Sequence, residues 1–144
     1  MAGILVIDDD RAVLSTIRIL LERDAHTVEA VDNSRAGLHL LETRKFDILI
    51  VDIFMPGMDG FETMSLARHS WPEMPMIVMS GHQFRSASER EPDFLYMATK
   101  LGATIGLQKP FKPRDLLAAV TSCLSEQPTS SGATKATQGD LPPD

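Results

Sequence analysis

The sequence has few of the residues that mark secreted or membrane-inserted proteins. Its 144 residues include one cysteine, Cys123, so an internal disulfide is excluded. A lone thiol without a Cys/His metal-ligand spacing fits a reducing cytoplasm, and in a predicted helix we expect it to be a small buried hydrophobe. The apolar run Gly3–Ile7 meets three aspartates, so it is too short for a signal peptide or a membrane span. We therefore expect a cytoplasmic protein with no membrane contact.

Positive charge is also scarce. Fourteen Lys and Arg residues against twenty Asp and Glu residues give a net charge of −6, with no basic stripe. Direct nucleic-acid binding is not expected, because nothing is placed to neutralise a row of phosphates. The 43% hydrophobic content is enough for the core of one domain, predicted over residues 1–126. Residues 127–144 are rich in Pro, Thr, Ser, Gly and Ala, which predicts a disordered tail or a linker.

Two apolar runs are each followed directly by aspartate residues. Ile48–Val51 leads into Asp52 and a Pro/Gly turn, and Gly3–Ile7 leads into Asp8 and Asp9. Unbroken β-branched runs are typical of strands buried on both faces, and ligands of open α/β sheets bind at the carboxyl ends of such strands. Converging carboxylates are costly unless a cation neutralises them. Hard oxygen ligands favour Mg²⁺ or Mn²⁺ at this edge.

Strand-like and helix-like segments alternate along the chain. Strands are predicted at about residues 3–7, 26–31, 46–51, 76–79 and 104–108, and helices at about 11–23, 34–43, 60–70, 92–101 and 113–125. Asp10 and Asn33 are the expected N-caps of the first two helices. The third helix carries its apolar residues at Phe61, Met64 and the pair Leu66/Ala67. Five alternations predict a parallel sheet that is covered by helices on both faces.

Four motifs stand at the ends of the predicted strands. They are Asp8-Asp9, Asp52 before Met55–Gly60, Ser80 after Ile77–Met79, and Lys109-Pro110-Phe111. Together and in this order they resemble the receiver domain of two-component response regulators, over roughly residues 3–125. The resemblance implies a flavodoxin-like (βα)5 fold with strand order 2-1-3-4-5.

The resemblance also implies an acceptor and a metal site. Asp52 would take a phosphoryl group from the phosphohistidine of a histidine kinase or a histidine phosphotransfer protein. Asp9 and Asp52 would ligate Mg²⁺ directly, Asp8 would act nearby or through water, and the backbone carbonyl of Phe54 would complete the protein ligands. Such a protein catalyses only its own phosphoryl transfer and dephosphorylation, and is otherwise not an enzyme. Its output is a switched protein-binding surface, and a homodimer is left open.

Two further residues have implied roles at the phosphoryl group. Lys109 would pair with the phosphoryl oxygens or with Asp52, and Pro110, cis by analogy, would set its direction. Ser80 would donate its hydroxyl to another phosphoryl oxygen. Taken one at a time, these motifs have plainer interpretations: a solvated turn at Lys109, a strand-end cap at Ser80, and a helix N-terminus favoured by its dipole at the aspartates.

Two other functions compete with a phosphorylated receiver. A pseudo-receiver would use the same fold for protein contact without phosphorylation, but the set of Asp9, Asp52, Ser80 and Lys109 is complete, which argues against it. A phosphatase of similar α/β design would also use an Asp nucleophile. That class needs a second acid two residues later, and Phe54 occupies the position.

The sequence departs from the receiver pattern at Gly106. Receivers usually carry Tyr or Phe three residues before the lysine, and the rotamer of that ring is coupled to the hydroxyl residue. One hypothesis is that Phe84, Phe94 or Tyr96, from the unusually long segment 82–102, fills the space. The alternative is that these rings are ordinary core residues and that Gly106 is a tolerated gap.

Overall fold

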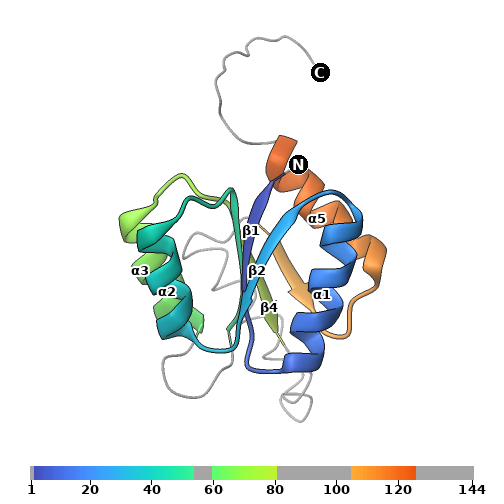
Figure 1. Ribbon diagram of the computed structural model, residues 1–144, viewed down its shortest axis with the longest axis horizontal. Coiled ribbons are helices and arrows are strands. Elements are labelled where there is room, and N and C mark those ends of the chain that lie inside the picture. The colour runs from blue at the N-terminus through green and yellow to red at the C-terminus, as the bar shows by residue number, and fades with distance from the viewer. Residues whose placement is uncertain (1, 54–59, 81–104, 126–144) are drawn as a thin grey trace, which may run out of the picture.

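The computed structural model describes residues 2–53, 60–80 and 105–125, which form a parallel sheet with helices on both faces (Figure 1). The elements are β1 (Gly3–Ile7), α1 (Arg11–Arg23), β2 (Thr27–Val31), α2 (Ser34–Thr43), β3 (Ile48–Asp52), α3 (Gly60–Ser70), β4 (Met76–Ser80), β5 (Ile105–Gln108) and α5 (Pro113–Ser125). The predicted helix at about 92–101 and the segment 127–144 lie outside the described residues. No helix within the described ranges is both long and apolar enough to span a bilayer.

The sheet confirms the predicted fold class. Its strands are all parallel and lie in the order β2-β1-β3-β4-β5. The predicted bounds differ by one or two residues at several strand ends, as is usual for boundaries. Strand β2 begins at Thr27 rather than His26 because the His26 amide donates to the Leu21 carbonyl and so closes the end of α1. Ala25, with φ of 70°, makes the left-handed turn there.

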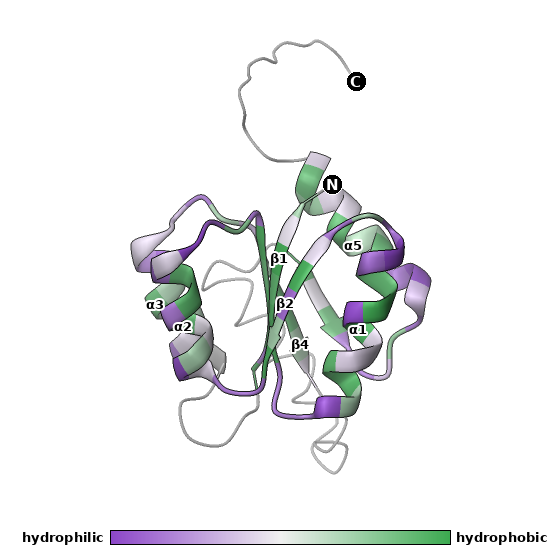
Figure 2. Cartoon of the chain, viewed as in Figure 1, coloured by the Kyte–Doolittle hydropathy of each residue, from purple (hydrophilic) through white to green (hydrophobic). Residues whose placement is uncertain are grey.

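Each face of the sheet has its own core. Helices α1 and α5 cover one face, and α2 and α3 cover the other (Figure 1). Neighbouring residues along a strand point to opposite faces, so that Ile4 packs under α1 and α5 while Leu5 packs under α2 and α3. The strands are hydrophobic along their length, whereas the helices are hydrophobic mainly on the side toward the sheet (Figure 2).

Burial in the helices follows the helical period. Cys123 is fully buried in α5, as expected. In α3, Met64 and Ala67 are buried and Leu66 is 44% exposed, so Ala67 is the member of the pair Leu66/Ala67 that faces the core. Met64 and Ala67 are three residues apart and share a helix face, and Leu66 is turned away from that face by the helical period.

Helix α2 approaches β1 closely at Gly37. A Cβ atom there would lie 2.3 Å from Ile7 Cδ1 and 2.8 Å from Ile7 Cγ1, and Ile7 is fully buried. Overpacking costs about 1–3 kcal/mol, while Ala gains about 1 kcal/mol over Gly in a helix. We expect Gly37→Ala to lower the free energy of unfolding by about 1 kcal/mol, measured by urea denaturation.

The matched control for this prediction is Gly3→Ala, because a Cβ at Gly3 meets nothing nearer than 3.7 Å. That variant should unfold close to the wild type. An unchanged or increased stability of Gly37→Ala would show that Ile7 can move aside without cost.

Candidate functional site

The carboxyl ends of β1 and β3 place two aspartates side by side. Ile7 is paired with Val51 in the register of these strands, so Asp8 and Asp52, the next residues, stand at the same level. Asp8 is fully buried and Asp52 is 3% exposed. Two carboxylates at neighbouring strand ends, shielded from water, need a positive partner.

Lys109 supplies this positive charge from the end of β5. Its Nζ atom donates to Asp8 Oδ2 at 2.6 Å and to Asp52 Oδ2 at 3.1 Å. The backbone amide of Lys109 donates to the Ser80 carbonyl at 2.8 Å, which fixes the chain where the side chain leaves it. Because the Lys109 side chain is only 15% exposed, its contacts with both acids are largely shielded from water.

Burial and charge act in opposite directions on these groups. Burial raises the pKa of the Asp8 carboxyl above its usual range, against hydrogen bonds from Lys109 and from the Asp10 amide that lower it. Burial would lower the pKa of the Lys109 ammonium, but the hydrogen bond to Asp8 and the charge of Asp52 outweigh it, and the pKa is raised. Lys109 is therefore charged at neutral pH.

A third carboxylate makes the cluster suitable for a divalent cation. Oxygen atoms of Asp8, Asp9 and Asp52 lie within 4.8 Å of one another. This spread is only slightly larger than about 4.2 Å, twice the Mg–O distance, so small side-chain rotations bring these hard oxygen ligands onto one ion. Both oxygens of Asp8 already accept hydrogen bonds, from the Asp10 amide at 2.9 Å and from Lys109, whereas Asp9 is exposed. The donor set fits Mg²⁺ or Mn²⁺.

Helix α1 holds Asp9 at the mouth of the pocket. The Asp10 side chain caps the helix as predicted, accepting from the Ala12 and Val13 amides at 3.0 and 3.4 Å. Asn33 caps α2 in the same way through the Ala36 amide. Because the cap fixes the first turn of α1, the residue before it is held beside the buried pair.

The exposed carboxylate of Asp9 can be tested without disturbing the buried pair. We expect Asp9→Asn to weaken Mg²⁺ binding by about 10–100-fold. Removal of a group that only supports a metal ligand already causes a loss of this size, and Asp9 is proposed as a ligand itself. Isothermal titration with Mg²⁺, or electron paramagnetic resonance with Mn²⁺, measures the affinity.

The matched control for the metal prediction is Asp10→Asn. It removes the same charge one residue further on, and asparagine is an equally good N-cap, so α1 keeps its first turn. The prediction fails if both variants bind Mg²⁺ with similar affinity.

The structure brings together four of the residues predicted for the site: Asp8, Asp9, Asp52 and Lys109. Ser80 is fully buried at the end of the neighbouring strand β4. The Lys109-Pro110 peptide bond is cis, as predicted. Phe54, the predicted carbonyl ligand, lies outside the described residues.

The main contact of Lys109 was not predicted from the sequence. Sequence reasoning paired the lysine with Asp52 or a phosphoryl group, whereas its shorter hydrogen bond in the structure is to Asp8. The available signal was the position of Asp8 directly after the apolar run Ile4–Ile7, where a carboxylate has little access to water.

Gly106 stands where receivers usually carry an aromatic residue. Gly106 lies in β5 opposite Val78 and is exposed. The aromatic residues suggested to replace the missing ring, Phe84, Phe94 and Tyr96, lie outside the described residues, so both explanations stay hypotheses.

Comparisons with known proteins agree with this geometry. A family model described as the response regulator receiver domain matches residues 4–121. Response regulator protein FleR of Pseudomonas aeruginosa is 34% identical over 116 residues, which are 81% of this chain and 23% of that protein. Response regulator MprA of Mycolicibacterium vanbaalenii is 32% identical over 130 residues, 90% of this chain and 53% of that protein. The chain thus spans about half, or less, of the curated relatives it matches.

Solved structures show the same fold. A response regulator receiver domain protein from Clostridium thermocellum is 31% identical with a TM-score of 0.77, covering 87% of this chain and 95% of that one. A CheY-like receiver domain protein from Methanospirillum hungatei is also 31% identical with a TM-score of 0.77, covering 88% and 96%.

Proposed function

The chain belongs to the response regulator receiver domain family, and from this premise we propose that it accepts a phosphoryl group on Asp52 with the help of Mg²⁺. The observation that carries the proposal is the bridge from Lys109 to two buried carboxylates beside a third, exposed one. A structural ion pair needs one acid. A lysine shared by two acids, next to an oxygen cluster that fits a divalent cation, suits a group that gains and loses a phosphate.

The proposed transfer starts at a carboxylate oxygen of Asp52. This oxygen attacks the phosphorus of a phosphohistidine, the phosphorus–nitrogen bond breaks, and its electron pair stays on the imidazole of the donor. A carboxylate nucleophile needs no general base, because it has no proton that must be removed before the attack. Lys109 offers its ammonium to the phosphoryl oxygens, and Ser80 offers its hydroxyl. Asp9, Asp52 and the Phe54 carbonyl would hold Mg²⁺, with Asp8 nearby, and the ion would supply positive charge that offsets the negative charge of the phosphoryl group.

The partners follow from this chemistry. The donor is a histidine kinase or a histidine phosphotransfer protein, as expected for two-component systems. The chain itself acts only on its own phosphoryl group, and the output is a change in a protein-binding surface. The match covers 57% of the transcriptional regulatory protein FixJ of Bradyrhizobium diazoefficiens, so a large part of that relative lies outside the matched region. The output partner is therefore not assigned.

Acetyl phosphate tests the proposal without a cognate kinase. In Mg²⁺ the full chain should gain the mass of one phosphoryl group, and peptide mapping after borohydride reduction should place it on Asp52. Chelation of the metal should prevent the gain. The pseudo-receiver alternative replaces the proposal if acetyl phosphate leaves the mass of the protein unchanged and beryllofluoride leaves its NMR chemical shifts unchanged.

A further inference from the structure

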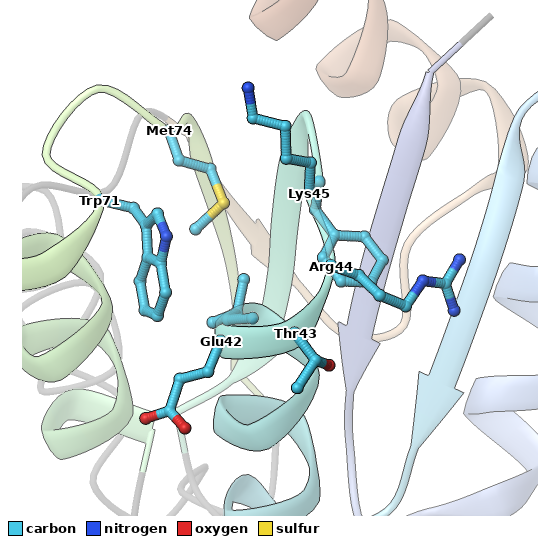
Figure 3. Close-up of a pocket in the computed structure, with 8 residues that line it drawn as sticks. Glu42, Thr43, Arg44, Lys45, Trp71 and Met74 are labelled. Carbon is cyan, nitrogen blue, oxygen red and sulfur yellow. The ribbon is translucent and has the colours of Figure 1, made fainter.

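A hollow opens at the edge of the sheet opposite to the aspartates. It has a volume of about 330 Å³ and lies between the ends of α2 and α3 and the segments that lead into β3 and β4. Its apolar residues are Leu41, Phe46, Trp71 and Met74. Figure 3 shows the Trp71 ring beside Met74 along one wall, with the Lys45 side chain extended at the rim. Trp71 is half-buried, so part of its ring remains open to an occupant.

The rim of this hollow carries an available positive charge. Arg44 is engaged, because its guanidinium pairs with Glu29 at 2.6 Å and lies 5.4 Å from the centre of the Phe46 ring. Lys45 is exposed and forms no ion pair within the described part of the chain. The Glu42 carboxylate points away from Lys45 at the other end of the hollow (Figure 3). The hollow therefore favours an apolar, extended occupant that ends in an acid near Lys45.

The chain beyond α5 contains a segment of this chemistry. Between residues 126 and 144 the only large apolar side chain is Leu141, which is followed by two prolines and Asp144. Proline-rich segments dock on aromatic side chains at low entropic cost, because their extended conformation is pre-formed. The Asp144 carboxylate, directly after the prolines, is opposite in charge to Lys45, which forms no ion pair among the described residues.

The end of α5 is close enough to deliver this segment. Helices of a parallel α/β sheet run opposite to the strands, so α5 ends at the same edge as α2 and α3, as Figure 1 shows. Residues 126–140 would span roughly 20 Å as a random coil and roughly 50 Å when extended. A domain of this size has a radius of gyration of only about 14 Å. The hollow is within reach from the end of α5.

We propose that Leu141-Pro142-Pro143 binds in the hollow against Trp71 and Met74, with the Asp144 carboxylate at Lys45. The site lies at the opposite edge of the sheet from the aspartate cluster and does not depend on the proposed phosphorylation. It would make the segment after the domain a ligand of the domain itself.

The single tryptophan of the chain makes the test specific, because all indole fluorescence comes from Trp71. In the chain of residues 1–144 we expect the triple variant Leu141→Ser, Pro142→Ser, Pro143→Ser to shift the emission maximum to the red and to increase quenching by acrylamide. The control variant Ala133→Ser with Ala136→Ser alters the same segment elsewhere and should match the wild type. All these positions lie outside the described residues, and circular dichroism checks that each variant keeps the fold. Identical quenching of the triple variant and the wild type would overturn the proposal.

A charge exchange tests the placement of Asp144. Lys45→Glu should increase quenching as the triple variant does, and the addition of Asp144→Lys should restore the wild-type value. Absence of that restoration would overturn the Asp144 contact. Dilution separates a contact within one chain from one between chains: protection that falls on dilution would assign the occupant to a second copy and would contradict the proposal.

Discussion

Asp52→Asn is expected to abolish the mass gain that acetyl phosphate produces in the presence of Mg²⁺. The amide that replaces the carboxylate is not a nucleophile toward phosphorus, and Asp52 is the acid that both faces Lys109 and stands level with Asp8. The variant should remain folded, because Lys109 keeps its 2.6 Å hydrogen bond to Asp8. Intact mass spectrometry measures the phosphoryl group, and circular dichroism checks the fold.

Asp32→Asn is the matched control for this experiment. Asp32 follows β2 at the same edge of the sheet, but its side chain is 39% exposed and pairs with Arg11 at 3.1 Å rather than with Lys109. This variant should be phosphorylated like the wild type. If Asp52→Asn gains a phosphoryl group as fast as Asp32→Asn, the acceptor is another residue and the proposed function is wrong in its central assignment.

Lys109→Met is expected to produce the largest loss of stability. Methionine keeps much of the aliphatic stem but removes the charge that neutralises Asp8 and Asp52, which are 0% and 4% exposed in their side chains. Removing one partner from a buried ion pair leaves an uncompensated charge, and the usual cost is about 3–5 kcal/mol. Because the pocket opens to water at Asp9, we expect the lower end of that range, about 3 kcal/mol in urea denaturation without divalent cations.

Mg²⁺ distinguishes this electrostatic cause from lost packing. A divalent cation supplies the missing positive charge, so Mg²⁺ should stabilise Lys109→Met by more than it stabilises the wild type. Lys112→Met provides the control, because Lys112 is exposed three residues further on and its loss should change stability by less than about 0.5 kcal/mol. A small loss in Lys109→Met, with equal effects of Mg²⁺ on both proteins, would mean that the acids do not rely on the lysine.

Much of this fold is encoded locally and was predicted from the sequence. The hydrophobic period of a strand or helix, the caps at Asp10 and Asn33, and the acids after the apolar runs can all be recognised within a few residues. The strand order and the roles of Ser80 and Lys109 came from the resemblance of the motifs to a known family. The pair Leu66/Ala67 shows the limit of such patterns, because two adjacent apolar residues of a helix do not reveal which of them faces the sheet.

The sequence by itself determined which elements form and which acids stand at the ends of strands, because these properties depend on neighbouring residues. Only the tertiary structure decided that Lys109 bonds to Asp8, 101 residues away, that a Cβ at Gly37 would collide with Ile7, and that Trp71 lines a hollow with Lys45 at its rim. Contacts of this kind depend on register and on the packing of helices against the sheet. Their partners are distant in the chain, and no local pattern records the distance between them.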